Sequence, residues 1–282
     1  MKKLFLFMLT ALLSVASWAG NIADVPTFII NSFVYGTAAY ATTGDLVVTA
    51  NDGITALTKD EDYTLGTTIY TDEACTTPAS SNAPKELHVG TYWVRVMGIG
   101  TFEGSMVKSF DVNTKELTLV TNAISKTYGA SDPAFGYTQA ADVTGGIVGT
   151  DDIGLTVTRE AGENVGTYAF VPAVSNTDYT IVSDGTKKFT INQQNLSATA
   201  AFTLETASND YTSKSNPATV TVNVVSNVTT PKVLSAGTDF TVKYYTDAAK
   251  TAEVAVADLK NAGTYYMNVE GKGNYTGTFT VP

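Results

Sequence analysis

The tripeptide Gly-Thr-Tyr occurs three times in the chain, as Gly90-Thr91-Tyr92, Gly166-Thr167-Tyr168 and Gly263-Thr264-Tyr265. Each copy is followed by residues that alternate between the two faces of an extended chain, as in Tyr92-Trp93-Val94-Arg95-Val96. Alternation with a period of two beside a glycine turn is typical of a half-buried β-strand. Three equivalent strands predict three modules of one general kind.

The composition also favours an all-β protein. Thr, Val, Ala and Tyr are plentiful, and charged residues make up only 16% of the chain, too few Glu and Lys for a helical protein. The formal net charge is −10. An acidic surface repels phosphate groups, so the sequence argues against nucleic acid and anionic lipid as partners.

Residues 1–19 are typical of a Sec-type signal peptide. Lys2 and Lys3 precede an apolar stretch of roughly 12 residues, and Ser17-Trp18-Ala19 forms a small-x-small cleavage site before Gly20. A spanning helix needs roughly 20 apolar residues, which this stretch lacks. We therefore expect export, an extracellular or cell-surface location, and no membrane span once the signal is removed.

Internal matches divide the rest of the chain into three predicted modules, at residues 20–114, 115–193 and 194–282. The segment 263–277 aligns with 90–104 without a gap, so the third module reads as a copy of the first. Its last strand stops near Pro282, so we expect that this strand is either short or truncated. The connectors 114–116 and 193–195 are short and lack Gly and Pro, so we expect semi-rigid joints in an elongated array of Ig-like (Greek-key) β-sandwiches.

The repeated tripeptide fits a tyrosine corner, in which a Tyr hydroxyl bonds to backbone upstream near the start of the penultimate strand. We expect each ring to be buried and each glycine to permit unusual backbone angles. The predicted structural residues are Gly90, Tyr92, Gly166, Tyr168, Gly263 and Tyr265.

A longer pattern in residues 115–192 carries a family resemblance. It contains Lys126-Thr127-Tyr128-Gly129, then Asp132-Pro133-Ala134-Phe135-Gly136-Tyr137, and later Arg159-Glu160 and Asn164-Val165-Gly166-Thr167-Tyr168. This segment resembles the MBG domain of the Tyr-Gly-x type, a bacterial Ig-like repeat of surface proteins. The flanking modules look like related bacterial Ig-like repeats. The resemblance implies a role in stalks and surface display and supplies no catalytic residues.

Residues able to carry catalysis are scarce. His88 is the only histidine and Cys75 the only cysteine, so we expect no enzyme activity, no cofactor and no internal disulfide. Both are read as turn residues, and an intermolecular disulfide at Cys75 is the alternative. The acidic clusters 60–62, 72–73 and 151–152 leave calcium as a second possibility beside solvated turns.

These observations predict a non-catalytic, secreted or cell-surface, adhesin-like protein whose tandem repeats form a stalk or spacer. The alternative is a surface module that binds an unidentified glycan or protein ligand. Tyr211, Tyr244 or Trp93 would stack on a sugar in that case, although Trp93 is also suited to packing between strands. Because Tyr244 and Tyr245 are adjacent in a predicted strand, one of them is expected to be exposed.

Overall fold

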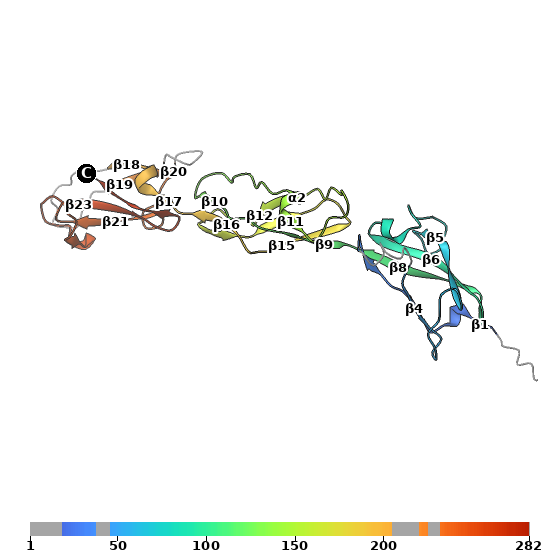
Figure 1. Cartoon of the computed structure of the whole chain (residues 1–282). Helices are drawn as coiled ribbons and strands as arrows, with labels where there is room; N and C mark the ends of the chain where they lie inside the picture. The colour runs from blue at the N-terminus through green and yellow to red at the C-terminus, as the bar shows by residue number, and fades with distance from the viewer. Residues whose placement is uncertain (1–18, 38–45, 205–219, 225–231, 282) are drawn as a thin grey trace, which may run out of the picture. The chain divides into compact units, whose positions relative to one another are not determined.

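The computed structural model describes residues 19–37, 46–204, 220–224 and 232–281 (Figure 1). Strands dominate, and the helices described are two α-helices of four residues, α2 (Gln139–Asp142) and α3 (Leu196–Thr199), and three single 3₁₀ turns. The all-β prediction is therefore confirmed. The predicted signal peptide lies outside the described residues apart from Ala19.

The described residues form two compact units. The first takes in the chain up to Glu116 together with Val148–Asp152 and Asn176–Thr180, and the second contains the remainder up to Pro282. Predicted modules 2 and 3 thus share the second unit. The arrangement of three separate sandwiches stays a prediction.

Module 1 is built on a four-stranded sheet with the order β3-β8-β6-β5. The alternating residues of β6 bury Tyr92, Val94 and Val96, as the period-two pattern predicts. The strands are β1 (Gly20–Asn21), β2 (Thr27–Ile30), β3 (Phe33–Val34), β4 (Val48–Asn51), β5 (Tyr63–Tyr70), β6 (Gly90–Gly98), β7 (Phe102–Glu103) and β8 (Ser105–Asn113).

Module 2 has three small sheets, with the orders β10-β16-β13, β11-β9-β15 and β12-β14. Leu119, Phe170, Phe189 and Ile191 form its buried core. The run after the second tripeptide was expected to be one strand, as after the first, and this is wrong, since the chain leaves one sheet after β13 and enters another at β14. The strands are β9 (Lys115–Leu119), β10 (Ile124–Thr127), β11 (Val143–Thr144), β12 (Thr156–Arg159), β13 (Gly166–Tyr168), β14 (Phe170–Ala173), β15 (Tyr179–Ser183) and β16 (Phe189–Asn192).

Module 3 contains a second four-stranded sheet, with the order β22-β21-β23-β25. Tyr265 precedes β23 and does not lie within it, and Tyr244 and Tyr245 are both buried, at 8% exposure each. The expectation that one of them is exposed is therefore wrong. The strands are β17 (Gln194–Asn195), β18 (Ala200–Leu204), β19 (Val220–Val224), β20 (Lys232–Val233), β21 (Phe240–Tyr245), β22 (Glu253–Val254), β23 (Tyr266–Gly271), β24 (Tyr275–Thr276) and β25 (Thr278–Val281).

One turn shows how closely module 3 repeats module 1. Asp72 accepts hydrogen bonds from the backbone amides four and five residues later, at 3.0 and 2.6 Å, and Asp247 does the same at 3.0 and 2.7 Å. These bonds hold the pKa of both carboxyls below the usual range. The third residue after each aspartate, Cys75 or Lys250, has a left-handed backbone with φ 53° or 54°. Cys75 therefore occupies a turn position, as expected.

Candidate functional site

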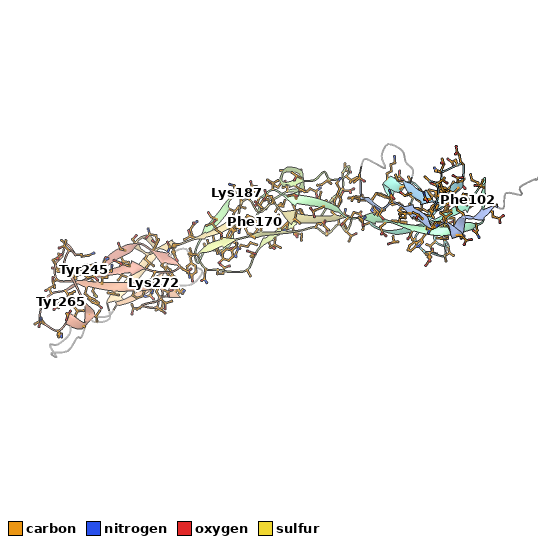
Figure 2. All side chains as sticks on the ribbon, turned by 90° about the horizontal axis from the view of Figure 1, so that it is seen from below. Phe102, Phe170, Lys187, Tyr245, Tyr265 and Lys272 are labelled. Carbon is orange, nitrogen blue, oxygen red and sulfur yellow. The ribbon has the colours of Figure 1, made fainter. Side chains whose placement is uncertain are left out.

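The three tyrosine corners share one hydrogen bond. Tyr92, Tyr168 and Tyr265 each donate from the hydroxyl to the backbone carbonyl four residues earlier, at 3.0, 2.7 and 3.1 Å (Tyr265 is labelled in Figure 2). Only the ring of Tyr92 is buried, at 8% exposure, whereas the other two are half-buried. The expected burial is therefore wrong for Tyr168 and Tyr265, and Tyr265 lies just before its strand β23.

The glycines of the tripeptide differ in backbone conformation. Gly166 has φ 158°, a value that L residues rarely adopt, whereas neither Gly90 nor Gly263 has a positive φ. The expectation that all three need unusual backbone angles is wrong. A Cβ on Gly90 would lie 3.5 Å from the Tyr92 ring, an ordinary contact, and nothing lies within 4 Å of one on Gly166 or Gly263.

Four charged side chains, three of them from the MBG-like motifs, meet in module 2. Lys126, whose side chain is 4% exposed, lies 2.7 Å from Asp132 and also pairs with Glu163. Arg159, 7% exposed, binds Asp132 at 2.7 and 3.1 Å and Glu163 at 2.6 Å. Hydrogen bonds from Arg159 and Lys126 hold the pKa of the Asp132 carboxyl below its usual range. Their pairing keeps all four groups charged.

This cluster acts as an internal brace. The remaining two N–H donors of Arg159 bind the carbonyl oxygens of Glu160 and Gly162, at 2.9 and 2.6 Å, so all five donors have partners. The guanidinium also lies 4.9 Å from the Phe189 ring centroid. A shallow hollow next to it is lined by residues 157–163 with Asp132 and Phe135. Because all five Arg159 donors have partners, its guanidinium ties the loop after β10 to residues 160–163 and has no spare donor for a ligand.

Two equivalent sets of contacts lie at the module boundaries. The first set, which we call the first joint, connects module 1 to residues 176–180. The Asp178 carboxylate accepts from the backbone amide of Val89 at 2.8 Å and lies 2.6 Å from Nδ1 of His88. The rings of Tyr35 and Tyr179 meet edge to face, with centroids 5.5 Å apart. Asp178 is only 5% exposed, so these partners satisfy a buried acceptor.

The second joint repeats these contacts between modules 2 and 3. The Asn274 side chain accepts from the backbone amide of Val165 at 2.8 Å and donates to the Asn164 side chain at 3.0 Å. The rings of Tyr128 and Tyr275 meet edge to face at 5.3 Å. Asn274 therefore occupies the position of Asp178, and each of the five residues has a counterpart in the first joint.

A charged residue completes each joint in a different way. Asp151 accepts hydrogen bonds from the hydroxyls of Tyr35 and Tyr179, at 3.0 and 2.6 Å. Burial and the bond to Asp151 raise the pKa of Tyr35 to about 12. At the second joint the Lys232 ammonium lies 5.4 and 5.6 Å from the two tyrosine ring centroids. The tyrosine pair is common to both joints, and the charge that binds it has the opposite sign.

The sequence contains a signal for these joints that lies outside the Gly-Thr-Tyr pattern. Tyr35-Gly36 repeats Tyr128-Gly129, and the amides of both tyrosines donate to the last residue of the module's final strand, at 2.9 and 2.8 Å. Module 1 therefore shares with module 2 both the Tyr-Gly element and the register of the Gly-Thr-Tyr strand, in which Tyr92 opposes Phe110 as Tyr168 opposes Phe189.

The other candidate residues lie in turns or in the joints. His88 belongs to the first joint, Asp62 accepts from the Thr58 amide, and Asp151 binds the two tyrosines. In the part of the chain that the structure describes, no three His, Cys, Asp or Glu side chains are grouped to hold a metal ion. Calcium binding stays a hypothesis. None of the helices described has the length and apolar character needed to cross a bilayer.

Residues 117–190 match the family model of the MBG domain (YGX type). The resemblance derived from residues 115–192 is thereby confirmed. The match indicates a bacterial repeat module of surface proteins. No curated protein matches the chain.

Proposed function

With an MBG domain at residues 117–190, we propose that the chain is a non-catalytic part of a bacterial surface protein, in which tandem β modules form a stalk or spacer. The repeated joint is the observation that supports this proposal most directly. The same backbone donor, side-chain acceptor and tyrosine pair occur at both module boundaries. Duplicated contacts at boundaries serve a repeated connection better than they serve a single active site.

The contacts within each joint are strong enough to stay formed most of the time. Each hydrogen bond contributes roughly 0.5–1.5 kcal/mol and each aromatic pair about 0.5–1.5 kcal/mol. Two hydrogen bonds and one ring pair therefore sum to about 1.5–4.5 kcal/mol per joint. Since 1.4 kcal/mol changes an equilibrium about tenfold, such a joint holds its closed form in large excess.

Small-angle scattering tests the spacer. A compact globule of the 263 residues left after the predicted signal peptide (282 − 19) has a radius of gyration of about 18 Å. We expect a clearly larger value for the native chain, and a broader distribution of dimensions for the double variant Asp178→Ala/Asn274→Ala. Asp258→Ala, an exposed aspartate of the 3₁₀ turn Val256–Asp258, is the matched control. A native value near 18 Å contradicts the proposal.

Export is the second part of the proposal. Cleavage of residues 1–19 would leave Gly20 as the new amino terminus, and its amide already bonds to the Thr101 carbonyl at 3.0 Å as the first ladder bond of β1. Mass spectrometry of protein released from the cell surface by protease should identify Gly20 at the terminus. Retention of Met1 in that fraction contradicts the proposal.

A second candidate function, binding of a surface glycan or protein, has one favourable observation. Trp93 lies on the outward face of β6 between the buried Tyr92 and Val94, and it pairs in register with Tyr70 of β5. Arg95 lies 6.0 Å from the Tyr70 ring centroid. Saturable binding on a glycan array that is lost in Trp93→Ala would favour this function. Of the other aromatic candidates, Tyr244 is buried, and Tyr211 lies outside the described residues.

A further inference from the structure

The strand that enters each module is paired in parallel with the strand after the last hairpin. β1 pairs in this way with β7, and β17 with β24. In module 2 the amide of Lys115 bonds to the Asp178 carbonyl and the amide of Asp184 to the Leu119 carbonyl, at 2.9 and 3.0 Å. Residue numbers rise together along both strands, so β9 and β15 are also parallel.

The strand that leaves a module is likewise paired in parallel, with the strand of the Tyr-Gly element. β16 lies beside β10 over four residue pairs, from Ile124 opposite Phe189 to Thr127 opposite Asn192. On its other side β16 pairs with β13. In module 1, β8 pairs with β3 in the same direction, with Val34 opposite Asn113. The leaving strand is therefore hydrogen-bonded along both edges in modules 1 and 2.

These pairings decide how module 2 responds when the chain is pulled. Force enters through Lys115, the first residue of β9, and leaves through Asn192, the last residue of β16. Each strand is then drawn along its own length against a parallel neighbour. Because ladder hydrogen bonds run across the strands, sliding loads all of them together, whereas peeling loads them one after another. A strand held in this way fails only when several bonds break at once.

We propose that β9 with β15, and β16 with β10, are shear clamps that allow the MBG domain to bear tension along the chain. The core supports the second clamp, because Phe189 and Ile191 of β16 are buried at 0% and 1% exposure and resist sliding past their neighbours. The first clamp begins at Asp178, which the first joint also holds. Tension resistance follows from strand pairing alone, so failure of the scattering test for a spacer would leave it intact.

Single-molecule pulling along two axes tests the clamps in one protein of fixed stability. Cysteines in a Cys75→Ser background carry the handles in the full chain. Thr114→Cys with Gln193→Cys loads both clamps in shear, whereas Ala130→Cys with Gln193→Cys pulls β10 and β16 apart from adjacent ends. Thr114 and Gln193 are exposed and Ala130 is partly exposed, and Gln193 is common to both axes.

We expect the mean unfolding force at one loading rate to be at least about twofold higher along the shear axis, because forced unfolding is governed by the unfolding rate. Since both variants share the same native fold, their equal thermal midpoints exclude a difference in stability as the cause. Equal forces along the two axes, or a higher force on peeling, overturn the proposal.

Discussion

Replacing Tyr92 with phenylalanine removes one hydroxyl from the tyrosine corner of module 1 and keeps the ring. The hydroxyl donates to the His88 carbonyl at 3.0 Å, and the ring is 8% exposed and stacked on Phe110 at 5.8 Å. Water cannot easily replace a donor at a site this well covered. The variant therefore loses the hydrogen bond and leaves a carbonyl poorly solvated, which costs about 1–2 kcal/mol.

The fluorescence of Trp93 makes this loss measurable in the three-module chain. Trp93 follows Tyr92 in β6, and the only other tryptophan is Trp18 in the predicted signal peptide. Tryptophan emission of the mature protein thus reports on module 1 alone. With a urea dependence of about 1–2 kcal/mol per molar for a domain of this size, the unfolding midpoint should fall by roughly 1 M.

A matched variant in another module controls for general effects of the substitution. Tyr168→Phe removes the equivalent hydroxyl from module 2, so the Trp93 transition should stay at its wild-type position. If Tyr92→Phe also unfolds at the wild-type midpoint, the hydroxyl contributes nothing to stability. The tyrosine-corner interpretation would then be wrong.

Three further predictions concern the charge cluster, the joint and one glycine. The pKa of Asp132 is lowered in the folded state by Arg159 and Lys126, so its contribution to stability is present at neutral pH and lost below about pH 4. In calorimetry from pH 7 to pH 3, the thermal stability of Arg159→Gln should therefore fall by less than that of the wild type. Equal losses of stability in the two proteins would contradict this role. Asp178→Ala should accelerate hydrogen exchange of the amide bound to its carboxylate about tenfold, whereas Asp178→Asn, which imitates the second joint, should retain most of the protection. Gly277→Ala should destabilise module 3 by about 1–3 kcal/mol in thermal unfolding, because φ is 82° and the new Cβ would collide with the Asn195 side chain. An unchanged unfolding midpoint would show that the glycine is not required there.

Local sequence patterns were enough to predict the all-β fold class and the duplication of module 1 in module 3. The period-two run after Gly90 is β6. The gapless match of 90–104 with 263–277 makes β23 the equivalent of β6 in the third module. Such features depend on neighbouring residues, which a sequence displays directly. The tyrosine hydrogen bond belongs to the same class, since its acceptor lies only four residues away.

Contacts between distant segments were harder to predict. Val89 and Val165 act through their backbone amides, which are present at every non-proline residue and give no sequence signal. Their acceptors, Asp178 and Asn274, look like ordinary turn residues until the fold brings them to the module boundary. The sequence presents Arg159 only as part of a family motif, because its partner Asp132 lies 27 residues earlier in the chain.

The acceptor position of the joint has a consequence for how such proteins diversify. Both joints rely on a backbone amide on one side and on one Asp or Asn on the other, Asp178 or Asn274. Removal of the gene segment for residues 115–193 would bring Asn274 to the amide of Val89, a pairing of the same donor and acceptor types. Recombination at module boundaries can therefore lengthen or shorten this chain without inventing a new connection each time.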